Sequence, residues 1–171
     1  MMQRDAAAWR DLATFLGLSP AEAEGIGQAA VDPAAFAAAH PEAASERLWG
    51  EEEEAEERAP GTLALLSLVD ALLERNFAIE QDWKDDWSEV SWSLGRMCSA
   101  RGLSPDLPEH LEGTPDETFV GAAASLAAVG AVLWGIDIDS DSYVATLLPL
   151  ARGADAEALA ARTGIEAQWW D

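Results

Sequence analysis

The sequence predicts an α+β domain in which helices flank a small, mainly antiparallel sheet. Three observations lead to this prediction. Helix caps and apolar residues at helical spacing recur along the chain, two apolar runs near the C-terminus flank a compact turn, and one further short run alternates as a strand does. Hydrophobic residues make up 49% of the 171 residues, which suffices for a packed core without disulfides.

Residues 1–60 are predicted to be all-helical, as a cap or a subdomain, and residues 61–171 to form the α+β domain. The first helix ends at Gly17, and its apolar face consists of Trp9, Leu12, Ala13 and Leu16. The segment SPAE, residues 19–22, combines an N-cap, a first-turn proline and the glutamate of a capping box.

Two shorter helical segments follow in this N-terminal region. Asp32-Pro33 begins one helix, and His40-Pro41 ends it. Another is predicted from about Ser45 through the acidic run Glu51–Glu57. Such a run is typical of a solvated face, although it also suits an acidic patch that binds a partner.

The segment after Gly61 begins with a leucine-rich helix that Asn76 ends. Phe77–Trp83 alternates as a strand, and Asp85 or Asp86 caps the helix that follows, which ends at Gly102. After a proline-containing loop, the capping-box segment TPDE, residues 114–117, begins a small-residue helix that extends to about residue 129.

Two apolar runs, Ala131–Ile138 and Tyr143–Leu150, are predicted to form an antiparallel hairpin joined by the turn DSDS. Alternation places Leu133 and Asp137 on one face and assigns the core face to Val132, Trp134, Ile136 and Ile138. Pro149 indicates that the second strand is an edge strand or ends there.

A last short helix is predicted over residues 155–163, and the chain finishes with the aromatic pair Trp169-Trp170. Two adjacent indole rings are unfavourable in water. The pair is therefore expected to dock on the domain or to contact another chain.

The hairpin turn contains the first candidate site. Asp137, Asp139 and Asp141 have the spacing of the first three ligands of an EF-hand calcium loop. The match then fails, because Ser142 replaces the required glycine and Leu148 replaces the bidentate glutamate. A hydrogen-bonded turn explains these residues better, so no metal ligand is predicted.

The second candidate site is DWKDDW, between the predicted strand and helix. Asp82, Asp85 and Asp86 flank Lys84, the one lysine of the chain. Paired carboxylates are suited to acid–base catalysis or to binding, whereas aspartates at this position also serve as ordinary helix caps. We interpret these four residues, together with Asp137, Asp139, Asp141 and Tyr143, as candidate binding residues.

The formal net charge of −22 limits the choice of partner. Such a field repels phosphate backbones and anionic lipids, which argues against nucleic-acid and membrane binding, and it favours a basic protein. The single Cys98 has no metal-ligand spacing and indicates a reducing, cytoplasmic setting. The N-terminus lacks the apolar segment of a signal peptide, and the longest apolar stretch is too short to span a bilayer.

Two function classes remain open from the sequence. One is a non-catalytic acidic interaction module, immunity- or inhibitor-like. The other is a hydrolase or metal-dependent enzyme that uses the clustered carboxylates. The sequence has no phosphate-binding glycine loop, HExxH motif or nucleophile elbow, so no catalytic residue and no cofactor is predicted.

Four sequence elements together resemble an uncharacterised bacterial domain family of unknown function. They are the helix Leu63–Asn76, the strand end Asp82–Lys84, the helix start Asp86–Ser91 and the hairpin Gly130–Tyr143. The resemblance covers residues 61–170 and leaves the first sixty residues outside. It implies a small bacterial domain and brings no catalytic residues. A looser similarity, in size and acidity, is to bacterial toxin-immunity proteins.

Overall fold

The structure is a computed structural model and describes residues 2, 4–41 and 61–171. The chain divides into two compact units. Unit 1 comprises Met1–Ala71 and Ala156–Ile165, and unit 2 comprises Leu72–Asp155 and Glu166–Asp171. Each unit therefore combines two separate segments of the chain. The predicted domain boundary after residue 60 adjoins residues outside the described part and stays a prediction.

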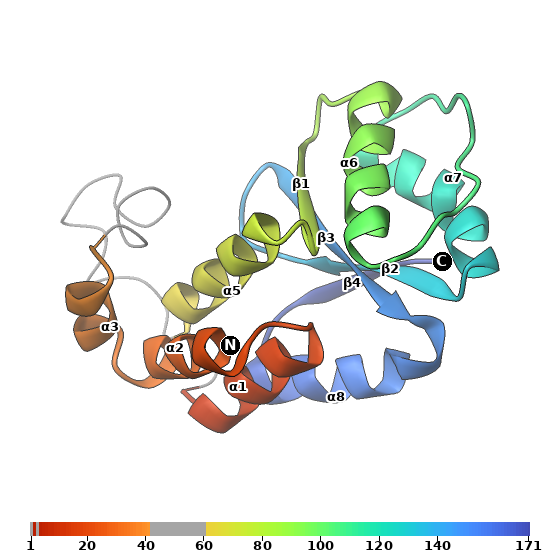
Figure 1. Ribbon diagram of the computed structural model, residues 1–171. Helices are drawn as coiled ribbons and strands as arrows, with labels where there is room; N and C mark the ends of the chain where they lie inside the picture. The colour runs from red at the N-terminus through yellow and green to blue at the C-terminus, as the bar shows by residue number, and fades with distance from the viewer. Residues whose placement is uncertain (1, 3, 42–60) are drawn as a thin grey trace. The chain divides into compact units, whose positions relative to one another are not determined.

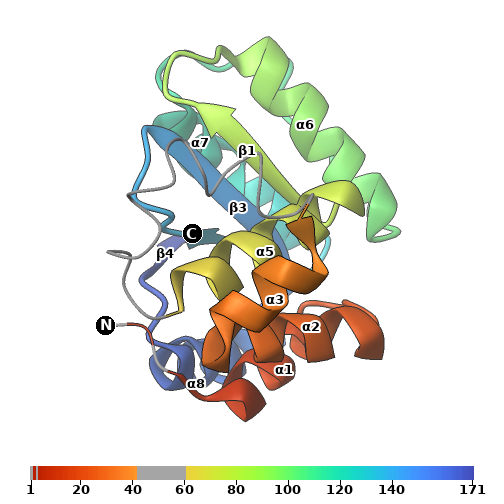
Figure 2. The same cartoon turned by 90° about the vertical axis from the view of Figure 1, so that its left-hand side faces the viewer.

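Unit 1 begins with three helices at the predicted positions: α1 (Ala6–Phe15), α2 (Pro20–Val31) and α3 (Pro33–Ala39). The capping box of α2 is confirmed, since Ser19 Oγ accepts from the Glu22 amide and the Glu22 carboxylate accepts from the Ser19 amide at 2.7 Å. Helix α1 packs beside α2, and α2 contacts α3 (Figure 2). The helix predicted from Ser45 through Glu57 lies outside the described residues.

Two further helices contribute to unit 1. They are α5 (Thr62–Glu74), of which residues 62–71 belong to this unit, and α8 (Gly153–Thr163), of which residues 156–163 do. The Arg162 guanidinium pairs with the Asp11 carboxylate at 2.9 Å and so links α8 to α1. The buried side chains of unit 1 include Trp9, Leu12, Leu16, Ile26, Leu65, Leu68, Val69 and Ala160.

Unit 2 contains a four-stranded antiparallel sheet with the order β1-β3-β2-β4 (Figure 1). Its strands are β1 (Ala78–Asp82), β2 (Ala131–Ile136), β3 (Ser142–Pro149) and β4 (Ala167–Trp170). The predicted hairpin is confirmed, because β2 pairs with β3 from Ala131↔Pro149 to Ile136↔Val144. Its turn is longer than DSDS, since the strands leave residues 137–141 outside the pairing. Strand β3 ends at Pro149 and is not an edge strand.

Helices α6 (Trp87–Ala100) and α7 (Pro115–Ala128) cover one face of this sheet (Figure 1). Both begin with a capping box, at Asp86 and Glu89 in α6 and at Thr114 and Glu117 in α7. The short 3-10 helix η1 (Leu150–Arg152) follows β3. Apolar side chains from both helices and all four strands form the core, among them Ile79, Val90, Leu94, Met97, Phe119, Leu126, Leu133, Leu147 and Trp170.

Strand β2 departs from the predicted one-sided alternation. All six of its residues are buried, and Leu133, assigned to the face opposite the core, is fully buried in the core under α6 and α7. The reason is that α6 and α7 cover the face of the sheet that carries Leu133, while β3 and β4 pair with the two edges of β2. Asp137 is exposed as expected, whereas Ile138 is only half-buried.

The C-terminal residues form β4, a strand that the sequence did not predict. It pairs with β2 from Leu133↔Trp170 to Ile136↔Ala167. The expectation that the two tryptophans dock on the domain is confirmed for Trp170, which is 3% exposed, while Trp169 is half-buried against Trp134. Strand β4 therefore completes the sheet of unit 2.

Candidate functional site

The register of β1 against β3 brings the two predicted acidic segments to the same end of the sheet. Asp82, the last residue of β1, pairs with Ser142, the first residue of β3. Beside this pair lies an open hollow of about 500 Å³, lined by Trp83, Ser140, Asp141, Ser142 and Tyr143. We call these five residues, together with Lys84, the strand-end surface.

The carboxylates of the DWKDDW segment accept hydrogen bonds from nearby backbone amides and so stabilise the local turn. Asp82 Oδ1 accepts from the Lys84 amide at 2.9 Å, and Asp85 Oδ2 accepts from the Asp82 amide at 2.9 Å. Asp86 is the N-cap of α6 and accepts from the amides of Ser88 and Glu89. These three aspartates thus build the sharp turn from strand to helix, as side chains of this length commonly do.

The hairpin loop is stabilised in the same way. Asp137 Oδ1 accepts from the Asp139 amide at 2.8 Å, and Asp139 has a φ of 56°, a left-handed conformation that aspartate tolerates. Ser140 Oγ accepts from the Ser142 amide at 3.1 Å. The exposed carboxylates of Asp139 and Asp141 have no hydrogen bond or ion pair with any described residue, and Asp141 is the one that lines the hollow.

Two aromatic rings and one cation complete the strand-end surface. Trp83 is 49% exposed, which is unusual for an indole, and the Lys84 ammonium lies 5.0 Å from its ring centroid. Tyr143 is half-buried, with its ring packed edge-on against Phe119. The surface therefore combines an open aromatic face with a carboxylate that has no partner in the described chain.

The predicted carboxylates lie on the surface of unit 2. Five of the six are exposed and Asp85 is half-buried. Within residues 4–41 and 61–171, no three histidine, cysteine, aspartate or glutamate side chains lie close enough to hold a metal ion. Cys98 is buried in the core of unit 2, and this burial raises the pKa of its thiol.

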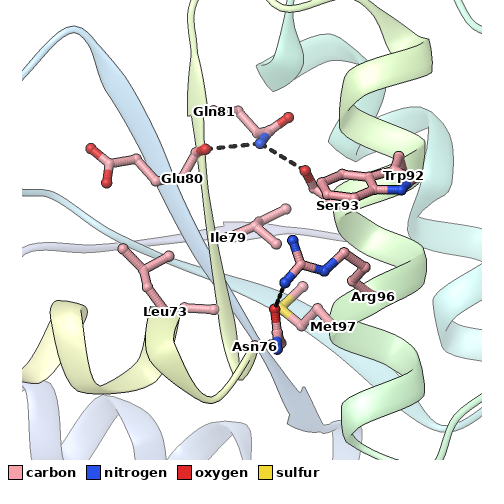
Figure 3. A pocket seen from close by; sticks show the side chains of 10 residues that line it. Leu73, Asn76, Ile79, Glu80, Gln81, Trp92, Ser93, Arg96 and Met97 are labelled. Atoms are coloured by element: carbon pink, nitrogen blue, oxygen red, sulfur yellow. Dashed lines mark hydrogen bonds between the residues drawn. The ribbon is translucent and has the colours of Figure 1, made fainter.

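A second concave surface, which the sequence analysis missed, lies between β1 and α6 (Figure 3). On its wall Gln81, 6% exposed, donates through its side-chain amide to the Glu80 carbonyl at 2.8 Å and to Ser93 Oγ at 3.0 Å. Trp92 and Arg96 line it from α6. Because these residues come from separate elements, only their alternation and helical spacing were visible in the sequence.

Comparison with known proteins identifies the family. A family model described as "Domain of unknown function (DUF6630)" matches residues 8–170. The chain belongs to this family. The DUF6630 match includes most of residues 1–60, so the prediction that the first sixty residues lie outside the resemblance was wrong. No curated protein and no solved structure matches the chain.

The DUF6630 match extends across both units, so residues of α1 and α2 belong to the family as much as the hairpin does. No helix in the described part of the chain has the length and hydropathy needed to cross a membrane.

Calcium is expected to leave the melting temperature of the protein unchanged. The Asp137 carboxylate already accepts a hydrogen bond from the Asp139 amide. Leu148 occupies the position at which a calcium loop needs a bidentate carboxylate. If a calcium site were present, a calcium concentration 100 times its dissociation constant would raise the free energy of unfolding by about 2.7 kcal/mol. Thermal melting detects a change of this size readily. A rise of several degrees that disappears in Asp139→Ala would contradict this prediction.

Proposed function

We propose that this protein is a non-catalytic interaction module that binds a basic protein through the strand-end surface. The observation that carries the proposal is the Asp82↔Ser142 pairing, since it places the exposed Trp83 beside Asp141, whose carboxylate has no partner among the described residues. Exposed tryptophans are frequent anchors of protein interfaces, and an adjacent carboxylate adds specificity for a cation.

The net charge supports the choice of a basic partner. With 32 acidic and 10 basic residues, the chain attracts a positively charged surface over distances of about a Debye length, near 8 Å at physiological salt. Such attraction accelerates encounter and weakens as salt rises. Binding through the strand-end surface is therefore expected to be faster and tighter at low ionic strength.

An inhibitor- or immunity-like role follows from this kind of binding. A basic surface that contacts phosphate groups is blocked when an acidic protein covers it. We place this role in the bacterial cytoplasm, a setting in which the single, buried Cys98 stays reduced. The partner is thus defined by its chemistry, as a protein with a basic functional surface.

The proposal is tested by retention of partners from an extract of the source cells at low and high salt. The strand-end variant Trp83→Ala/Asp141→Asn removes the aromatic anchor and the carboxylate beside it. Its matched control, Trp92→Ala/Glu109→Gln, removes the same two kinds of side chain elsewhere on unit 2, where both are exposed. We expect a basic protein to be retained at low salt by wild type and control, and to be lost with the strand-end variant.

Two results would overturn the proposal. Equal retention by wild type, control and strand-end variant would show that overall charge, and not this surface, holds the partner. Absence of any retained basic protein at low salt would remove the reason for proposing an interaction module.

A further inference from the structure

The surface between β1 and α6, which we call the β1–α6 groove, has a volume of about 330 Å³ and lies within unit 2 (Figure 3). The half-buried Leu73 and the exposed Trp92 and Arg96 border it, and the buried side chains of Ile79 and Met97 lie behind them. The volume falls at the lower end of the range of small-molecule sites, which is about 300–1,000 Å³. The groove therefore suits a ligand of modest size.

Arg96 is the cation of this groove. Its guanidinium carbon lies 4.7 Å from the centroid of the Trp92 ring, and its Nη2 donates to Asn76 Oδ1 (Figure 3). Both contacts fix the direction of a long side chain that is otherwise exposed. A guanidinium held in this way loses less conformational freedom when it binds an anion.

Arg96 has no carboxylate partner among the described residues, although the chain contains 32 acidic residues. Its two contacts are with a neutral amide and an aromatic ring. The guanidinium fork matches the planar carboxylate group, with which it forms paired charge-assisted hydrogen bonds. The groove thus offers a guanidinium without a carboxylate partner in the described chain, beside the Leu73 side chain and the Trp92 ring.

We propose that the β1–α6 groove binds a small monocarboxylic acid with an apolar body. The carboxylate pairs with Arg96, and the apolar body rests on Leu73 and the exposed Trp92 ring. A single negative charge is favoured over phosphate esters or polyanions, because the net charge of −22 and the Glu80 side chain at the groove repel each added charge. This site is separate from the strand-end surface, and its occupation does not depend on the proposed function.

Phenylacetate and phenylacetamide are suitable probes, since they share size and shape and differ in charge. Each is titrated into the full chain up to millimolar concentrations, and the indole N–H resonance of Trp92 is followed by NMR, assigned from its absence in Trp92→Ala. We expect saturable shifts with phenylacetate and at least tenfold weaker binding of phenylacetamide, because the amide cannot form the charged pair with Arg96.

Two variants distinguish binding of phenylacetate in the groove from general electrostatic attraction to exposed cations. Arg96→Met keeps most of the side-chain volume and is expected to weaken phenylacetate binding at least tenfold, without changing the melting temperature by more than a few degrees. Arg152→Met is the matched control, because Arg152 is also an exposed arginine of unit 2 and lies outside the groove and the strand-end surface. It is expected to bind phenylacetate as wild type does.

Three outcomes would overturn the inference. They are the absence of phenylacetate binding to wild type, equal binding of the acid and the amide, and unchanged binding in Arg96→Met. If short peptides with a free C-terminal carboxylate bind and phenylacetate does not, the groove is a peptide site and the proposal of a small-acid site is wrong.

Discussion

Replacing Trp170 with alanine is expected to lower the free energy of unfolding of unit 2 by about 3–5 kcal/mol. The indole is 3% exposed and packs against Phe119 with ring centroids 4.9 Å apart. Its Nε1 donates to Asp116 Oδ1 at 2.6 Å, and this carboxylate lies in the first turn of α7. Alanine removes the ring, the hydrogen bond and the link from β4 to α7 together.

Urea denaturation measures this loss of stability. Two further variants separate the contribution of ring packing from that of the hydrogen bond. Trp92→Ala makes the same chemical change at a residue that is 63% exposed, so it should alter stability by no more than about 0.5 kcal/mol. Trp170→Phe keeps most of the packing but loses the hydrogen bond to Asp116, and its effect should fall between the other two. A loss below about 1 kcal/mol in Trp170→Ala would show that the docking of β4 contributes little to stability.

Gly135→Ala is expected to destabilise the protein by about 1–3 kcal/mol, as overpacked core substitutions do. An added Cβ would lie 2.6 Å from both Cη2 and Cζ3 of Trp170. Real Cβ atoms essentially never approach a neighbour so closely, and the ring is fixed by Phe119 and Asp116. Replacing glycine with alanine inside a strand ordinarily raises the free energy of unfolding by about 0.5–1 kcal/mol. A decrease in Gly135→Ala would therefore show that the steric clash outweighs this gain.

Gly95→Ala provides the control of opposite sign. Gly95 lies inside α6 with no atom within 4 Å of an added Cβ, so alanine should stabilise the helix by about 0.5–1 kcal/mol. The collision is isolated by the double variant Gly135→Ala/Trp170→Ala, in which the second substitution removes the ring. If Gly135→Ala destabilises equally in both backgrounds, Trp170 is not the cause.

Local hydrogen bonding explains why most helix ends were predictable. The segments beginning at Ser19 and Thr114 carry proline and glutamate at the positions of a capping box, and both boxes form. Gly17 and Gly130 have φ values of 93° and 78°, a left-handed conformation that favours glycine at these helix ends. All these signals depend on neighbours within four residues, which the sequence displays directly.

Long-range pairing explains what the sequence did not reveal. Strand β4 has only four residues, of which Ala167 and Gln168 are exposed, so it lacks the alternation of a strand. Its position depends on pairing with β2, more than thirty residues earlier. The same pairing makes β2 a central strand, and α6 and α7 bury Leu133 on one face of the sheet.

The candidate site was predictable only in part. DWKDDW and DSDSY are recognisable in the sequence as two separate acidic segments. The register Asp82↔Ser142 brings them to the same end of the sheet. The β1–α6 groove was not visible, because Trp92 and Arg96 resemble ordinary solvated positions until β1 is placed beside α6.

The divided composition of the two units bears on how the chain folds during synthesis. Unit 1 requires Ala156–Ile165 and unit 2 requires Glu166–Asp171, so neither can finish packing until these segments have left the ribosome. Until then β2 lacks β4, and its open edge can pair with other chains. Mutual repulsion among nascent chains that carry most of the −22 charge opposes such pairing, so the acidity also protects the protein before it is complete.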